Sequence, residues 1–145
     1  MGRVEKSIEI RVPPEKVWEM LSFDKHLEWM DGYKSVEYTS KVHTPEDKYR
    51  VGASAYIIEH VKYDLEITES LENEKMTYRF EVRRISMIMT YILEPIDEGT
   101  KFTYTVDYEM HWSFLGKIIE KLYLRRHIEK ETEKSLETLK SILEK

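Results

Sequence analysis

Apolar and polar residues alternate along most of the first 110 positions, which is typical of half-buried β-strands. The alternation predicts a first strand at 3–12. After an interval it predicts six consecutive strands, at 33–41, 51–60, 62–71, 76–82, 85–93 and 102–110. Short turns separate these six, including the hairpin-type sequence Asp-Glu-Gly at 97–99. Because strands joined by short turns pair as a meander, the pattern predicts one seven-stranded antiparallel sheet.

The interval between the first and second strands predicts two short helices. The sequence Pro-Pro-Glu at 13–15 ends the first strand and begins a helix, because proline is tolerated in a first helical turn. Trp18 lies on the apolar face of this helix. A second helix is expected to start near residue 24, with Asp24 as its N-cap. Leu27 and Met30 are expected to point inward from it.

From about residue 113 to residue 145 the pattern predicts one long helix. Its apolar stripe consists of Leu115, Ile118, Ile119, Leu122, Leu136, Leu139 and Leu143. A sheet with one apolar face has to be covered, and this helix is the only predicted element long enough to cover it. We therefore expect a single α+β domain over residues 1–145. Its expected architecture is a helix-grip fold, in which a curved antiparallel sheet and a long C-terminal helix enclose a cavity.

The stripe of the long helix is interrupted by a polar stretch at Arg125, Glu129 and Thr132. Ile118, Leu122 and the neighbouring Tyr123 are expected to face the sheet before this gap. In one interpretation the gap overlies a solvated cavity, and Arg125 binds an anionic or carbonyl group of a ligand. In the other, the stripe drifts around the helix, and Arg125 pairs on the surface with Glu129 at i,i+4.

Composition narrows the classes of function. The chain has no cysteine, which excludes disulfides and thiolate metal sites and fits a cytoplasmic location. Its net charge of −5 argues against nucleic-acid binding, and no apolar run is long enough to span a membrane. Abundant lysine and glutamate suit a thermophile. Ten Tyr, three Trp and seven Met supply the side chains that fill irregular apolar space in cores and in adaptable pockets.

Several short sequences match the pattern of one known superfamily. They are the strand-proline-helix sequence IEIRVPPEKVW at 8–18, the stretch from Glu28-Trp29-Met30 to Ser35-Val36-Glu37, Val51-Gly52, and SLETLK at 135–140. In this order and spacing, the whole chain resembles the Bet v 1-like or START-like (SRPBCC) superfamily, in particular its small polyketide cyclase/dehydrase-like branch. The resemblance implies the helix-grip fold and an apolar cavity. The superfamily includes lipid carriers, quinone-binding proteins, hormone receptors, aromatase/cyclases and co-chaperones, so the fold alone does not select a function.

The inward faces of the strands and of the long helix provide the candidate cavity lining. We expect it to consist of Ala53, Ala55, Ile57, Leu65, Ile67, Tyr78, Phe80, Met87, Met89, Tyr91, Tyr104, Tyr108, Ile118, Leu122 and Arg125. The tyrosine hydroxyls would be the few polar groups that such pockets contain. A packed core built from the same residues is the alternative. Small residues in the third strand favour unfilled space, although they also permit a sheet to bend.

The family topology implies a cavity entrance near residues 60–62, Arg83, Arg84 and the segment 112–116. Trp112 and Phe114 in that segment fit an apolar lid or a loop that touches a membrane transiently. They also fit a hydrophobic staple at a helix start, with Ser113 as the cap. The basic residues would attract an acidic head group, although exposed arginines are common in turns.

Catalytic motifs are scarce. The five histidines, His26, His43, His60, His111 and His127, have no metal-ligand spacing. His127 and Glu131 share a helix face, but a zinc site needs further ligands. The chain also lacks the nucleophile elbow of a serine hydrolase and has no glycine-rich phosphate loop. We expect neither a metal nor a cofactor.

The leading hypothesis is a carrier or sensor, without catalytic activity, of a hydrophobic small molecule. The ligand would be a lipid, an isoprenoid quinone or an aromatic, polyketide-like metabolite. The first alternative is a cyclase or dehydratase that uses the same cavity, with Tyr, His or Arg side chains as acid or base. The second is a co-chaperone-like interaction domain, which requires a large exposed apolar patch. A monomer or weak dimer is expected, without stable membrane insertion.

Overall fold

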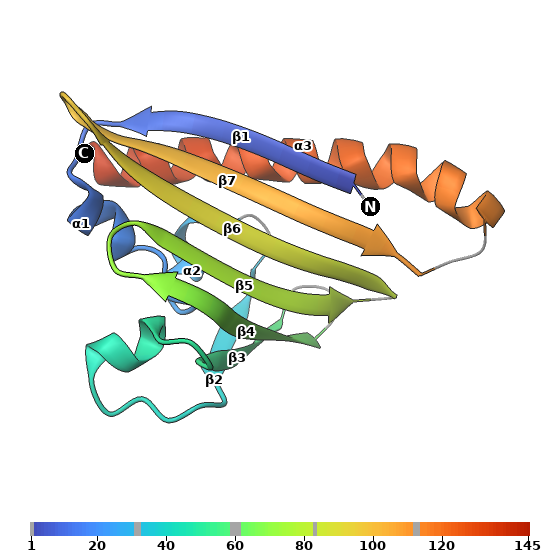
Figure 1. Cartoon of the computed structure of the whole chain (residues 1–145), viewed down its shortest axis with the longest axis horizontal. Coiled ribbons are helices and arrows are strands. Elements are labelled where there is room, and N and C mark those ends of the chain that lie inside the picture. Colours follow the sequence, from blue (N-terminus) through green and yellow to red (C-terminus); the bar gives the residue numbers. More distant parts are fainter. Residues whose placement is uncertain (1, 31–32, 59–61, 83, 112–113) are drawn as a thin grey trace.

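The computed structural model describes residues 2–30, 33–58, 62–82, 84–111 and 114–145, except for the side chains of 114–117 and 119–121. These residues form a curved antiparallel sheet with a long helix running beside β1 and β7 (Figure 1). The strands are β1 (Gly2–Ile10), β2 (Ser35–Tyr38), β3 (Ser54–Ile58), β4 (Lys62–Leu71), β5 (Lys75–Val82), β6 (Ile85–Ile96) and β7 (Gly99–Met110). The expected α+β helix-grip fold is confirmed.

The sheet order is β1-β7-β6-β5-β4-β3-β2, and every neighbouring pair is antiparallel. Strands β2 to β7 therefore form the predicted meander, and β1 closes it by pairing with the last strand. Gly99 lies where β6 turns into β7. A Cβ atom at Gly99 would collide with the carbonyl oxygen of Ile10, so the close approach of β1 requires a glycine at this position.

The helices are α1 (Pro14–Trp18), α2 (His26–Trp29), the 3-10 helix η1 (Pro45–Tyr49) and α3 (Phe114–Leu143). Two local predictions for α2 are wrong. Asp24 does not cap the helix, because its carboxylate accepts a hydrogen bond from the Tyr38 hydroxyl at 2.8 Å. Leu27 is exposed and His26 is buried, so the inward face is rotated by one residue from the expected one. Among the described residues, no helix is long and apolar enough to cross a bilayer.

Helix α3 covers the free edge of β1 as well as the inner face of the sheet. The Lys140 ammonium donates to the Glu9 carbonyl at 2.6 Å, and the Arg125 guanidinium donates to the Arg3 carbonyl at 3.0 Å. Lys6 of β1 also pairs with Glu133 of α3 at 3.0 Å. Side chains of the helix thus satisfy backbone groups that an edge strand would otherwise expose.

The inner face of the sheet is filled unevenly along its length. At the end where β6 passes Tyr91 and β7 passes Phe102, the segment 17–30 contributes Phe23 and Trp29 to a dense aromatic cluster. The Phe23 ring meets the ring of Tyr78 edge-on, with centroids 5.4 Å apart. Towards the β5–β6 turn the short helices provide no such filling, and the functional candidate lies there.

Candidate functional site

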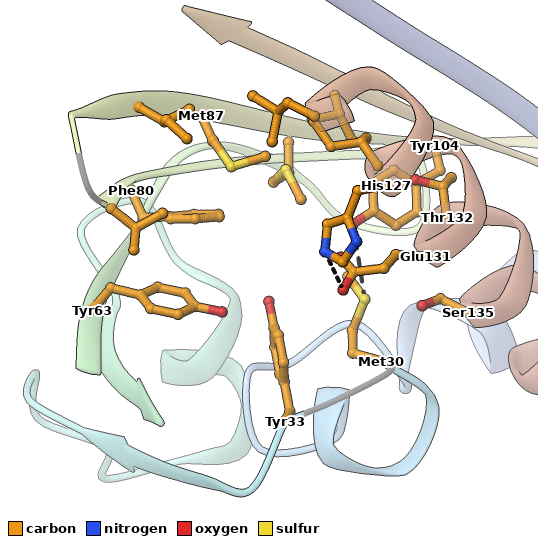
Figure 2. A pocket seen from close by; sticks show the side chains of 16 residues that line it. Met30, Tyr33, Tyr63, Phe80, Met87, Tyr104, His127, Glu131, Thr132 and Ser135 are labelled. Carbon is orange, nitrogen blue, oxygen red and sulfur yellow. Dashed lines mark hydrogen bonds and ion pairs between the residues drawn. The ribbon is translucent and has the colours of Figure 1, made fainter. Parts of the chain in front are cut away.

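A cavity of about 420 Å³ lies between the sheet and the middle of α3 (Figure 2). It is lined by Met30, Tyr33, Tyr63, Phe80, Val82, Ile85, Met87, Met89, Tyr104, Val106, Leu124, His127, Ile128, Glu131, Thr132 and Ser135. Strands β4 to β7 form the floor, α3 forms the opposite wall, and the chain around α2 contributes Met30 and Tyr33. The size is within the usual range of small-molecule pockets, about 300–1,000 Å³.

The floor of the cavity is apolar. The Tyr63 ring stacks on Phe80 with centroids 4.8 Å apart. Met87 and Met89 lie beside them on β6, and all four residues line the cavity. Methionine is flexible and polarisable and therefore adapts to ligands of irregular shape. This surface suits a planar or branched apolar body.

Polar groups gather on the helix side. Thr132 and Ser135 are buried on the inner face of α3, and His127 pairs with Glu131 at 3.0 Å (Figure 2). From other elements, the hydroxyls of Tyr33 and Tyr63 point into the cavity (Figure 2). A mostly apolar pocket with a few polar groups on one side orients an amphipathic ligand.

Tyr104 connects this cavity with a second layer of polar side chains. Its hydroxyl contacts the Met30 sulfur at 3.8 Å, and its ring meets that of Tyr91 edge-on, with centroids 4.9 Å apart. Tyr91 belongs to a buried hydrogen-bond chain that also contains Tyr78 and His26. In that chain the two tyrosine hydroxyls are 2.8 Å apart, and the Tyr91 hydroxyl lies 2.8 Å from His26 Nε2.

The direction of this chain follows from its last acceptor. His26 Nδ1 is 2.8 Å from the Ser22 carbonyl oxygen, which only accepts, so Nδ1 carries the proton. In a neutral ring Nε2 is then an acceptor, and the Tyr91 hydroxyl donates to it. The oxygen of Tyr91 in turn accepts from the Tyr78 hydroxyl. All of these groups are satisfied by each other, which is the condition for burying a polar network at little cost.

Burial keeps this network uncharged. It lowers the pKa of His26 to about 4, while the Ser22 carbonyl and the Asp24 charge oppose the shift. Burial also raises the pKa of Tyr78, Tyr91 and Tyr104 well above the ordinary value. At neutral pH all three phenols are therefore uncharged, and Tyr104 presents one of them at the cavity wall, where it donates and accepts hydrogen bonds.

Four of the expected lining residues do line the cavity, namely Phe80, Met87, Met89 and Tyr104. Eight others are buried but lie outside it: Ala53, Ala55, Ile57, Leu65, Ile67, Tyr78, Tyr91 and Tyr108. Tyr78 and Tyr91 are separated from it by their packing against Phe23, Trp29 and His26. Ala53 and Ala55 thus belong to the packed core and do not border this cavity.

Three expected lining residues on α3 point elsewhere. Ile118 and Leu122 are 50% and 73% exposed, and the neighbouring Tyr123 is 72% exposed. Arg125 is also exposed and pairs with Glu129 at 3.2 Å, so it has the surface role that was the alternative interpretation. The reason is helical phase, since Leu124 and Ile128 face the cavity and Ile118 and Leu122 lie on another side of the helix.

Most of the expected entrance lies outside the described residues, which exclude Arg83, Trp112 and the side chain of Phe114. Arg84 is described and has a φ of 63° in the β5–β6 turn. Its carbonyl accepts a hydrogen bond from the His111 amide at 2.8 Å. The turn is adjacent to Val82 and Ile85, which line the cavity.

Sequence reasoning missed the helix side of the cavity, at Leu124, Ile128 and Ser135. A signal was present, because these residues and Thr132 recur at helical spacing, but two of the four are polar and broke the apolar stripe. It also missed Tyr33, Tyr63 and the buried His26. Within the described parts of the chain, no three His, Asp or Glu side chains come together as a metal site would need.

Solved structures of the same fold cover nearly the whole chain. Protein BH1534 from Bacillus halodurans is 17% identical with a TM-score of 0.74, and the match covers 99% of this chain and 98% of that one. The Aha1 dimer from Colwellia psychrerythraea is 16% identical with a TM-score of 0.70, covering 99% and 97%. The di-domain ARO/CYC StfQ from the steffimycin biosynthetic pathway is 12% identical with a TM-score of 0.79, covering 98% of this chain and 50% of that one. A search of curated proteins found no match.

At such identities the structural likeness establishes the fold alone. The sequence itself gives the family, because the model of one family matches residues 1–144. That match agrees with the element order, with the sheet covered by α3 and with the cavity between them. The chain belongs to the polyketide cyclase/dehydrase and lipid transport family.

Proposed function

We propose that this protein binds a hydrophobic small molecule in the cavity between β4–β7 and α3 and acts as its carrier or sensor. The observation that carries the proposal is the cavity itself. It is lined by methionine and aromatic side chains on the sheet and by a few polar groups on the helix. The ligand is a lipid, an isoprenoid quinone or an aromatic, polyketide-like metabolite.

The distribution of apolar and polar groups in the lining supports an amphipathic ligand. Its apolar body would lie over Phe80, Met87 and Met89, and its polar group would reach Ser135 or the His127–Glu131 pair. Burial of a ligand's apolar surface contributes roughly 25 cal/mol per Å², so the apolar floor supplies most of the affinity. The polar groups then select among ligands of similar size.

Native mass spectrometry of protein purified from its own host tests the proposal. Wild-type protein should carry a bound small molecule, and Ser135→Phe should lose it, because the added ring occupies the cavity. Glu137→Phe places the same ring on an exposed position of the same helix and should retain the ligand. Equal ligand occupancy in all three proteins would rule out this cavity as the binding site.

A second candidate function is a cyclase or dehydratase, and one observation favours it. Tyr104 brings a neutral phenol to the cavity wall, where its hydroxyl contacts the Met30 sulfur, a weak acceptor, at 3.8 Å. Such a hydroxyl is suited to donate a hydrogen bond to a substrate carbonyl. The enzyme hypothesis predicts that Tyr104→Phe abolishes turnover of a polyketide-like substrate but changes its affinity little. A carrier would show no turnover in either protein.

A further inference from the structure

The first half of α3 exposes apolar side chains that the rest of the fold does not cover. Leu122 and Tyr123 are 73% and 72% exposed, and Ile118 is half exposed. Ile118 and Leu122 are four residues apart and therefore share one face of the helix. Tyr123 adds an exposed aromatic ring beside that face, and exposed apolar side chains that gather on one part of a surface mark a candidate interaction site.

The sequence of this helix segment is rich in cationic residues. Positions 117–126 contain four lysine or arginine residues and one glutamate, a net charge of +3. The whole chain has a net charge of −5, so the remainder, −5 minus +3, carries −8. Arg125 is paired with Glu129, whereas Arg126 is exposed, and no carboxylate of the described residues pairs with it. Arg126 follows Leu122 by four residues and lies on the same face.

We propose that Ile118, Leu122, Tyr123 and Arg126 form a docking surface for an anionic lipid bilayer. A helix with exposed apolar and aromatic side chains beside lysine and arginine lies in the interface of such a membrane. The bilayer's negative surface potential attracts the basic segment and repels the acidic remainder of the chain, which fixes the orientation. A second copy of the chain fits less well, because a symmetric contact would bring two basic segments together.

The position of the surface gives docking a consequence for the cavity. Leu124, which immediately follows Tyr123, lines the cavity, as does His127 one residue after Arg126. A bilayer that contacts the outer face of this helix segment therefore lies beside the helix wall of the cavity. Docking itself needs no bound ligand, so it can be tested independently of the proposed ligand binding.

Co-sedimentation of the full chain with lipid vesicles tests the proposal. Vesicles of equal parts phosphatidylcholine and phosphatidylglycerol should bind the protein, pure phosphatidylcholine vesicles should bind it much less, and added salt should weaken the binding. Replacing both Leu122 and Tyr123 by serine should reduce the partition coefficient at least about ten-fold. Arg126→Ala should reduce it about five-fold on anionic vesicles alone.

Leu71→Ser is the matched control. Leu71 is 52% exposed at the end of β4, and the β4–β5 turn lies at the opposite end of the molecule from the start of α3 (Figure 1). This variant should bind vesicles as the wild type does. Equal binding by the wild type and the Leu122/Tyr123 variant would overturn the proposal. So would dimerisation in ultracentrifugation that is lost in that variant, without vesicle binding by the wild type.

Discussion

Acidification should destabilise the fold through His26, whose imidazole is buried and hydrogen-bonded on both nitrogens. Burial lowers the pKa of this imidazole from 6.5 to about 4. Protonation would also place a proton on Nε2, which now accepts a hydrogen bond from Tyr91. The charged ring would thus lose a partner within a site that does not solvate charge.

The sign and the size follow from the two pKa values. The folded pKa lies below the unfolded one, so the unfolded chain binds the proton more readily. The contribution of the neutral His26 ring to the free energy of unfolding is fully present above the unfolded pKa of 6.5. It is lost as the pH falls from 6.5 through the folded pKa of about 4. Each pKa unit corresponds to about 1.4 kcal/mol, so the loss between neutral pH and pH 4 is about 3 kcal/mol.

Denaturant unfolding at pH 7 and pH 4 measures this loss, with His26→Gln as the non-titrating comparison. Carboxylates such as Asp24 titrate in both proteins and cancel in the difference. The free energy of unfolding of the wild type should fall by about 3 kcal/mol more than that of the variant. NMR titration of the His26 ring gives the folded pKa directly. Equal losses in the two proteins, or a ring that titrates near its ordinary pKa, would refute the reasoning.

Four further substitutions test other parts of the structure by equilibrium unfolding. Tyr91→Phe should lower the free energy of unfolding by about 1–3 kcal/mol, because it leaves His26 Nε2 without its hydrogen-bond donor. Tyr78→Phe should lower it by only about 1 kcal/mol. Equal losses would contradict the assigned direction of the hydrogen bonds. Gly99→Ala should cost about 2 kcal/mol or more, because its Cβ would meet the β1 backbone, and an unchanged midpoint would show that the strands can separate. Arg125→Ala should change the free energy of unfolding by less than about 1 kcal/mol, because Arg125 forms an exposed ion pair. Ligand occupancy in native mass spectra should be unchanged in this variant. A loss of ligand would show that Arg125 contributes to the binding site.

The sheet could be predicted because its signal is local. A strand buried on one face alternates with period two, and consecutive short turns leave little choice but a meander. Strand ends were less certain, as β2 is confined to Ser35–Tyr38 and β6 continues through Pro95 to Ile96. The 3-10 helix η1 was expected only as a turn. Its capping box between Thr44 and Asp47 is legible in the sequence once the helix is known.

The site was harder to predict because it depends on which face of each helix turns inward. Apolar spacing shows which residues share a face of α3, but the packing of the whole domain decides which face is covered. The apolar pattern therefore predicts Leu122 in the cavity, although it is exposed, and does not predict the polar Ser135, which lines the cavity. Helix α2 has only four residues, too few for a periodic signal. Its buried face therefore contains His26, where the sequence predicts Leu27.

The most direct test of the proposed ligand site uses NMR of the methionine methyl groups. Met30, Met87 and Met89 line the cavity, whereas Met20, Met76 and Met110 are buried outside it. The hydrophobic dye anilinonaphthalenesulfonate, added to protein labelled with ¹³C in its methionine methyl groups, should shift the first three resonances and leave the other three in place. Shifts confined to Met20, Met76 or Met110, or no shift at saturating dye, would contradict a ligand site between the sheet and α3.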